Sequence, residues 1–142
     1  MQENINALDE IHKGACMGVD AVTYVLDKVE DQKLEKELKR EKEAYEDIER
    51  RIEEIYPKYD EDSPHSTSAL NKAMTMSKVE LETLMDQSNS HIAEFLLKGV
   101  NMGVIEGRKI LNKKNLNEEV ENIVAEYVSM QEKAIESLKS FL

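Results

Sequence analysis

The sequence has one cysteine, two prolines, five glycines and no tryptophan among its 142 residues. The single cysteine, Cys16, excludes an internal disulfide and fits a reducing compartment. So few prolines and glycines leave little room for turns, which favours a chain that is helical throughout. No apolar run approaches the ~20 residues of a membrane-spanning helix, and the acidic N-terminus has no apolar signal region. We therefore expect a single helical-bundle domain, residues 1–142, in the cytoplasm.

Positive charge is also scarce. The chain has 19 lysines and arginines against 30 aspartates and glutamates, and its formal net charge is −11. No basic run stands free of interleaved acidic residues, so nucleic acid and anionic membranes are poor partners on electrostatic grounds. The partners that stay open are a second copy of the chain, in a homodimer, or another protein with a basic surface.

Apolar residues recur at a spacing of three and four along most of the chain, which is the pattern of amphipathic helices. The pattern predicts five helices: one from near Asn4 to a turn at Glu30 and Asp31, a second from Asp31 to Pro57, a third at Ser66–Asp86, a fourth at about Asn89–Lys113, and a fifth after Asn117. Asn4, Asp31, Ser88 and Asn117 are suitable N-cap residues for four of them.

A motif, Lys-Gly-x-x-Met-Gly-Val, occurs at residues 13–19 and again at residues 98–104. The likeness extends through the first and fourth predicted helices, and the second aligns with the fifth, for example Leu38 with Val124 and Ile52 with Leu138. The chain therefore reads as two pseudo-symmetric helical hairpins joined by a long crossover that contains an extra helix. This arrangement is one of the known topologies of the four-helix bundle.

The motif places two glycines four residues apart in each repeat, Gly14 with Gly18 and Gly99 with Gly103. A glycine inside a helix costs about 1 kcal/mol relative to alanine, so these positions need a reason. Small residues at this spacing let two helix backbones approach closely. We expect the first and fourth helices to cross antiparallel, with glycine against glycine. A ligand lying against the bare backbone and a homodimer contact are the alternatives.

The stretch SHIAEFLLKGVNMGVIEGRKILN, residues 90–112, resembles small uncharacterised helical-bundle proteins of anaerobic Gram-positive bacteria, and the architecture resembles the ferritin-like superfamily. Di-iron members of that superfamily carry a glutamate on each of two helices and Glu-x-x-His on each of the other two. Here the residue three positions after Glu41 is Ala44 instead of histidine. At the comparable position of the last helix stands Tyr127, and the residue three positions after it is Met130. The resemblance therefore implies the fold without di-iron chemistry.

Polar residues on the predicted core faces are the candidates for a site. His12 lies between Asp9 and Cys16 at a spacing that suits metal ligands, and an antiparallel crossing would place Glu106 opposite His12. Glu41, Tyr45, Tyr127 and Gln131 could form a second polar layer. The simpler interpretation is a buried polar network.

Two functions follow from these candidates. The leading hypothesis is a non-catalytic ferritin-like bundle without a cofactor, which has a binding or structural role and self-associates. The alternative is a metal-binding or redox protein with a reduced or degenerate site, in which His12, Glu41 and Glu106 hold a transition metal ion.

Overall fold

The computed structural model describes residues 2–60, 64, 88–113 and 115–142. All regular structure within these residues is helical: α1 is Gln2–Leu26, α2 is Gln32–Ile55, α4 is Asn89–Leu111 and α5 is Glu118–Lys139, and a short 3₁₀ helix, η1, at Tyr56–Lys58 follows α2. This confirms the prediction of an all-α four-helix bundle. The remaining predicted helix, Ser66–Asp86, lies outside the described residues. No helix in the described part of the chain is long and apolar enough to cross a membrane.

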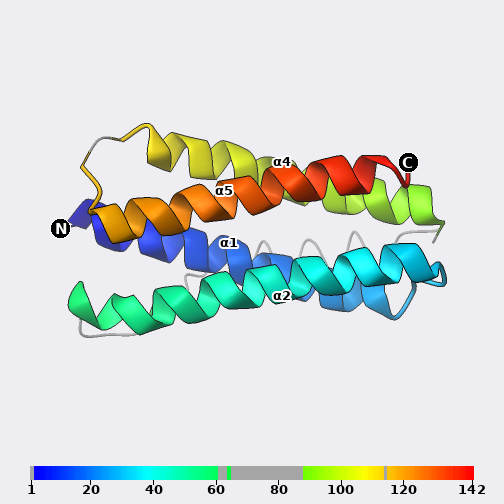
Figure 1. The fold of residues 1–142 in the computed structure, drawn as a ribbon, viewed down its shortest axis with the longest axis horizontal. Coiled ribbons are helices and arrows are strands. Elements are labelled where there is room, and N and C mark those ends of the chain that lie inside the picture. Colours follow the sequence, from blue (N-terminus) through cyan, green and yellow to red (C-terminus); the bar gives the residue numbers. More distant parts are fainter. Residues whose placement is uncertain (1, 61–63, 65–87, 114) are drawn as a thin grey trace.

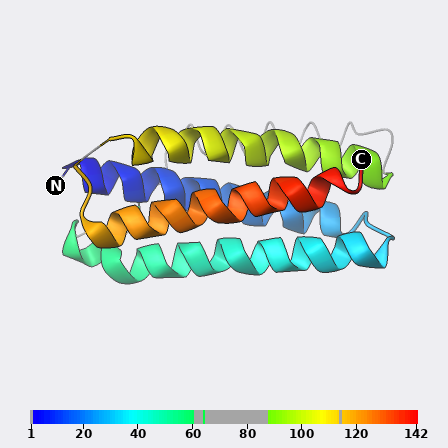
Figure 2. The same cartoon turned by 45° about the horizontal axis from the view of Figure 1, so that its top comes forward.

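The four long helices lie side by side along one axis (Figures 1 and 2). α1 is antiparallel to both α2 and α4, and α5 is antiparallel to α4. α2 ends at the end of the bundle where α1 begins, whereas α4 begins at the opposite end. As a result α2 and α4 run in the same direction, and residues 60 and 88 lie at opposite ends of the bundle.

Two of the predicted helix caps are present. The Asp31 carboxylate accepts hydrogen bonds from the backbone N–H groups of Lys33 and Leu34, at 2.8 and 3.0 Å, and starts α2. The Ser88 hydroxyl accepts from the backbone N–H of His91 and starts α4. Each cap satisfies N–H groups that have no partner within their own helix, which is why the helices begin at these residues.

The prediction that Asn4 caps α1 is wrong, because α1 already begins at Gln2. Asn4 is buried within the first turn, and its side-chain oxygen accepts a 2.8 Å hydrogen bond from the backbone N–H of Asn117. Asn117 is the N-cap residue of α5, as predicted, but its own side chain makes no capping bond. Asn4 therefore ties the first turn of α1 to the beginning of α5.

The core consists of the apolar residues that the helical spacing selects on each helix. Those that are fully buried include Leu8, Ile11, Ala15, Val25, Leu34, Leu38, Ile52, Ile92, Val120, Val124 and Leu138. Burying one such aliphatic side chain stabilises the fold by roughly 1.5–3 kcal/mol for the larger residues. This burial, rather than helix propensity, holds the four helices together.

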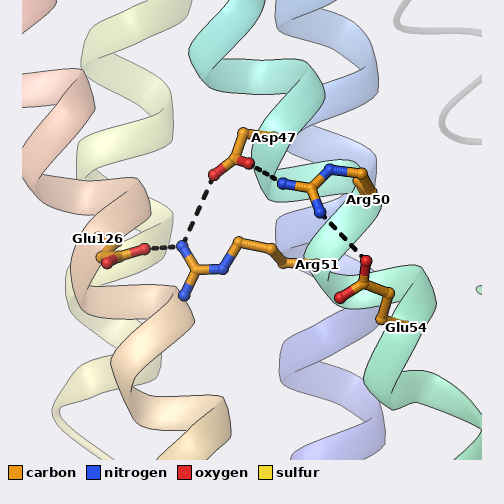
Figure 3. Close-up of polar contacts among 5 residues, drawn as sticks. All are labelled: Asp47, Arg50, Arg51, Glu54 and Glu126. Carbon is orange, nitrogen blue, oxygen red and sulfur yellow. Dashed lines mark hydrogen bonds and ion pairs between the residues drawn. The ribbon is translucent and has the colours of Figure 1, made fainter.

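The outer surface carries ion pairs within and between helices. Arg50 pairs with Asp47 and with Glu54 along α2, whereas Arg51 reaches from α2 to Glu126 on α5 (Figure 3). These side chains are largely exposed, so water and dissolved salt weaken each pair and its contribution to stability is small. The pairs therefore assist the contact between α2 and α5, and the buried core determines it.

Candidate ligand-binding site

A cluster of buried polar residues lies between α2 and α5. The Tyr45 hydroxyl donates a 2.5 Å hydrogen bond to Oε1 of Gln131, and the Gln131 side chain is also hydrogen-bonded to the hydroxyl of Tyr127. Tyr45 and Tyr127 are each 3% exposed, and Gln131 is 2% exposed. The polar layer that the sequence suggested thus includes a chain of three hydrogen-bonded side chains in the interior.

The glycines of the repeat do not face one another, so the expected glycine-to-glycine crossing is wrong. A Cβ atom built on Gly14 would collide with the hydroxyl of Tyr127, and one built on Gly18 would collide with the ring of Tyr45. A Cβ atom on Gly103 would collide with the amide of Gln131. The glycines therefore make room for large polar side chains from α2 and α5, which stand between α1 and α4.

These contacts follow the internal repeat. Gly18 and Gly103 are matched residues of the first and fourth helices, and Tyr45 and Gln131 are matched residues of the second and fifth. Gly18 packs on Tyr45 as Gly103 packs on Gln131. The two halves of the chain thus use the same contact, with a tyrosine in one half and a glutamine in the other.

The repeat is broken at the other pair of glycines. Gly14 packs on Tyr127, and the matched residues are Gly99 and Glu41. No described residue lies within 4 Å of a Cβ atom built on Gly99. Gly99 is an exposed residue of α4, whereas Gly14 is covered by the tyrosine ring.

A cavity of about 650 Å³ occupies this region between α1 and α4. The polar cluster and all four glycines of the repeat line it. Its apolar lining comes from Met17, Ala21, Val22, Tyr24, Phe95, Leu96, Val100 and Met102, and charged residues at its boundary are Glu10, Lys13, Asp20, Lys98 and Glu106. An apolar cavity with a few convergent polar groups is the usual form of a small-molecule site.

Glu41 is the most unusual residue of this cavity. It is 2% exposed, and its Oε2 atom accepts no hydrogen bond from any described residue. Burial, followed by a hydrogen bond to the Glu37 carboxylate and its negative charge, raises the pKa of Glu41 to about 9. Glu41 is therefore a neutral acid near pH 7, and it donates its proton to Glu37. The pKa of Glu37 is lowered despite partial burial, because Glu41 and Arg40 both donate to it.

The two tyrosines are also neutral over the physiological range. Burial raises the pKa of Tyr127 to about 12, although the hydrogen bond from Gln131 opposes this shift. Burial likewise raises the pKa of Tyr45, and so does repulsion from Tyr127 and Glu41 at the high pH where those groups have ionised. The polar groups of the cluster are thus uncharged hydrogen-bonding groups.

His12 does not join this cluster, and the expectation that it pairs with Glu106 is wrong. Its Nε2 atom lies 3.1 Å from Oε1 of Glu53 on α2, and its Nδ1 atom lies 3.7 Å from the Sγ atom of Cys16. His12 and Gly14 are two residues apart, which is about 200° around a helix. Since Gly14 faces the polar cluster, His12 faces the opposite side, toward α2.

Glu106 is exposed and forms an ion pair with Lys109, at 3.6 Å. Glu41 lies in the interior, so the proposed metal ligands His12, Glu41 and Glu106 are in three different environments. More generally, no three histidine, cysteine, aspartate or glutamate side chains among the described residues are placed to hold a metal ion.

Sequence reasoning missed the role of two glutamates. Glu37 lies four residues before Glu41, one turn away on the same helix face, so its contact with Glu41 could have been anticipated. Glu49 accepts a hydrogen bond from Cys16 and, after burial, is the main reason that the pKa of this thiol is raised to about 12. That contact depends on the register between α1 and α2, for which the sequence has no local signal.

Comparison of the chain with protein-family models, with curated proteins and with solved structures finds no match. The class of the molecule is therefore defined by its own features. It is an all-α four-helix bundle with a neutral polar cluster in its interior and a partly open cavity between α1 and α4, whose lining includes the exposed residues Gly99 and Met102.

Proposed function

We propose that this protein is a non-catalytic bundle of the ferritin-like kind, and that it binds a small molecule in the cavity between α1 and α4. The observation that carries the proposal is the cavity itself, which is lined by the exposed Gly99, with no described residue within 4 Å of its Cβ position, and by the residues of the polar cluster. A volume of about 650 Å³ falls within the range of about 300–1,000 Å³ that is usual for ligand sites.

The direction of the helices supports the ferritin-like part of this proposal. α2 and α4 are parallel, so α2 ends at one end of the bundle and α4 begins at the other. A single long crossover of this kind distinguishes ferritin-like bundles from bundles in which every connection is short.

The alternative, a metal-binding or redox protein, has less support. Its three proposed ligands do not meet, and the positions where di-iron members carry histidine hold Ala44 and Met130. A binding role also fits the neutral state of the buried polar groups, because a metal ion needs deprotonated carboxylates as ligands.

The test is to measure binding of fluorene, an uncharged hydrocarbon of three fused rings, to the purified chain by fluorescence titration. We expect saturable binding of one molecule per chain. The Gly99→Leu variant should weaken it at least about tenfold, because the new side chain extends into the space beside Gly99, where no described residue lies within 4 Å of the Cβ position.

The matched control is Thr23→Leu, which adds a leucine at an exposed position of α1 outside the cavity. It should leave the affinity unchanged. Absence of saturable binding to the unaltered chain, or equal affinity for the chain and its Gly99→Leu variant, would contradict the proposal.

A further inference from the structure

The outer face of α4 carries large apolar side chains. Met102 is 64% exposed and Ile105 is 47% exposed, and Leu142 at the end of the chain is the other exposed large apolar residue among those described. Met102 and Ile105 are three residues apart, so they are neighbours on one face of the helix. Phe95, two turns before Met102, extends this strip and is only partly buried against the core. An exposed apolar strip of this kind is typical of a contact with another protein surface.

The internal repeat shows that the packing of the bundle does not require this strip. α1 contains the residues matched with those of α4, and there Glu10 is matched with Phe95 and Asp20 with Ile105. α1 packs into the bundle with charged residues at these two positions. The apolar residues of α4 therefore need a reason that lies outside the four-helix core.

The charge of α4 indicates which partner fits it. α4 carries three basic side chains against two acidic ones, namely Lys98, Arg108 and Lys109 against Glu94 and Glu106. Each of the other three long helices carries more acidic than basic side chains. Because the whole chain has a net charge of −11, a second copy of it meets the least electrostatic repulsion at α4.

The charges on either side of Met102 are complementary to themselves. Lys98 lies four residues before Met102 and Glu106 lies four residues after it, and both are exposed. When two α4 helices pack antiparallel about a twofold axis at Met102, Lys98 of each copy lies opposite Glu106 of the other copy. Lys98 forms no ion pair with any described residue, so it is available for this contact. Gly99, which neighbours Met102 on the helix, has no side chain to keep the second helix away.

We propose that the protein forms a homodimer in which the α4 helices of two copies pack antiparallel, with Met102 at the centre and a Lys98–Glu106 ion pair on each side. These three residues also border the cavity, so the second copy lies across part of its opening. The proposal goes beyond the binding function, because the contact needs no ligand and is tested without one.

The test is sedimentation equilibrium of the purified chain over a range of concentrations, in which we expect a dimer. Glu106→Lys places lysine opposite Lys98 on both sides of the axis, so it should weaken dimerisation at least about tenfold. Net charge alone predicts the reverse, because this substitution makes the chain less acidic. The double variant, Lys98→Glu with Glu106→Lys, restores both ion pairs at unchanged net charge, and its dimerisation should return.

The matched control uses a lysine on another helix. Lys98→Glu should dissociate the dimer, whereas Lys36→Glu, which makes the same change of charge at an exposed position of α2, should leave it in place. A circular dichroism melt of each variant verifies that the bundle is folded.

Three results would overturn the dimer. They are a monomer at every concentration of the unaltered chain, a dimer that survives Glu106→Lys, and a double variant that stays monomeric. None of them affects the binding function, which the fluorene titration tests separately.

Discussion

Tyr45 donates its hydroxyl hydrogen to Gln131 across the interior of the bundle, and these two residues are matched members of the internal repeat. Matched residues that touch each other must lie near the axis that relates the two halves of a repeat. Each of them also packs on a matched glycine, Gly18 or Gly103. A hydrogen bond between large side chains thus joins the two halves near this axis, and the glycines provide the room for it.

The first prediction concerns this bond. Tyr45→Phe leaves Oε1 of Gln131 buried without its donor, which should lower the free energy of unfolding by about 1–3 kcal/mol in a urea titration. Gln131→Met in the same chain removes the acceptor as well. The double variant should therefore lose less stability than the sum of the two single variants.

Tyr59→Phe is the matched control for this cycle. The Tyr59 hydroxyl also donates a hydrogen bond, to the carboxylate of Glu119, but at a partly exposed position at the end of the bundle. Water replaces a lost partner there, so the cost should stay below about 1 kcal/mol. If the double variant instead lost as much free energy of unfolding as the sum of Tyr45→Phe and Gln131→Met, the hydrogen bond would contribute no coupling energy between the two residues.

The second prediction uses two glycines of the repeat that have different surroundings. Gly18→Ala places a methyl group against the ring of Tyr45, so it should cost about 1–3 kcal/mol in spite of the better helix propensity of alanine. Gly99→Ala meets no described residue within 4 Å, so it should stabilise the chain by up to about 1 kcal/mol. Thermal or urea unfolding of both variants measures the difference, and an equal effect of both would contradict the packing described here.

The sequence predicted the fold better than the site, and particular residues explain why. Asp31 and Ser88 cap helices through their own neighbours, so a local pattern was enough to place the beginnings of α2 and α4. The polarity of the interior was also visible, because Glu41 and Tyr45 interrupt an apolar helix face. Helix starts and polar residues on an apolar helix face can be recognised from the spacing of residues within one helix.

Which residues meet across the bundle depends on the rotation of each helix about its axis. The glycine pairs suggested close backbones, but the same spacing also accommodates a tyrosine from a third helix, as at Gly14 and Gly18. His12 was expected on the side of α4, and it lies on the side of α2, near Glu53. A rotation of a fraction of a turn separates these outcomes, and the apolar pattern of one helix does not determine it.

The third prediction concerns Cys16. Burial and the neighbouring Glu49 raise the pKa of its thiol to about 12, so the reactive thiolate is scarce at pH 8. The folded protein should react with a disulfide reagent at least about tenfold more slowly than the urea-unfolded chain. Glu49→Gln removes one cause of the shift and should accelerate the reaction, whereas Glu54→Gln, on the same helix, should not. Equal rates for the folded and unfolded chains would contradict the raised pKa.

The last prediction concerns Glu41 and pH. Its pKa is raised from 4.5 to about 9, so the folded state holds a proton that the unfolded chain releases between these values. Stability from this group is fully present below about pH 4.5 and is lost as the pH rises toward 9. Glu41→Gln mimics the neutral acid and has no proton to lose. The free energy of unfolding of Glu41→Gln minus that of the unaltered chain should therefore grow by on the order of 1 kcal/mol per pH unit between pH 5.5 and 8.5. Urea titrations of both proteins across this range measure the slope, with Glu43→Gln, an exposed substitution on α2, as the control that should run parallel to the unaltered chain. If the free energy of unfolding of Glu41→Gln had the same pH dependence as that of the unaltered chain, Glu41 would be ionised in the folded state. The polar cluster would then not be neutral.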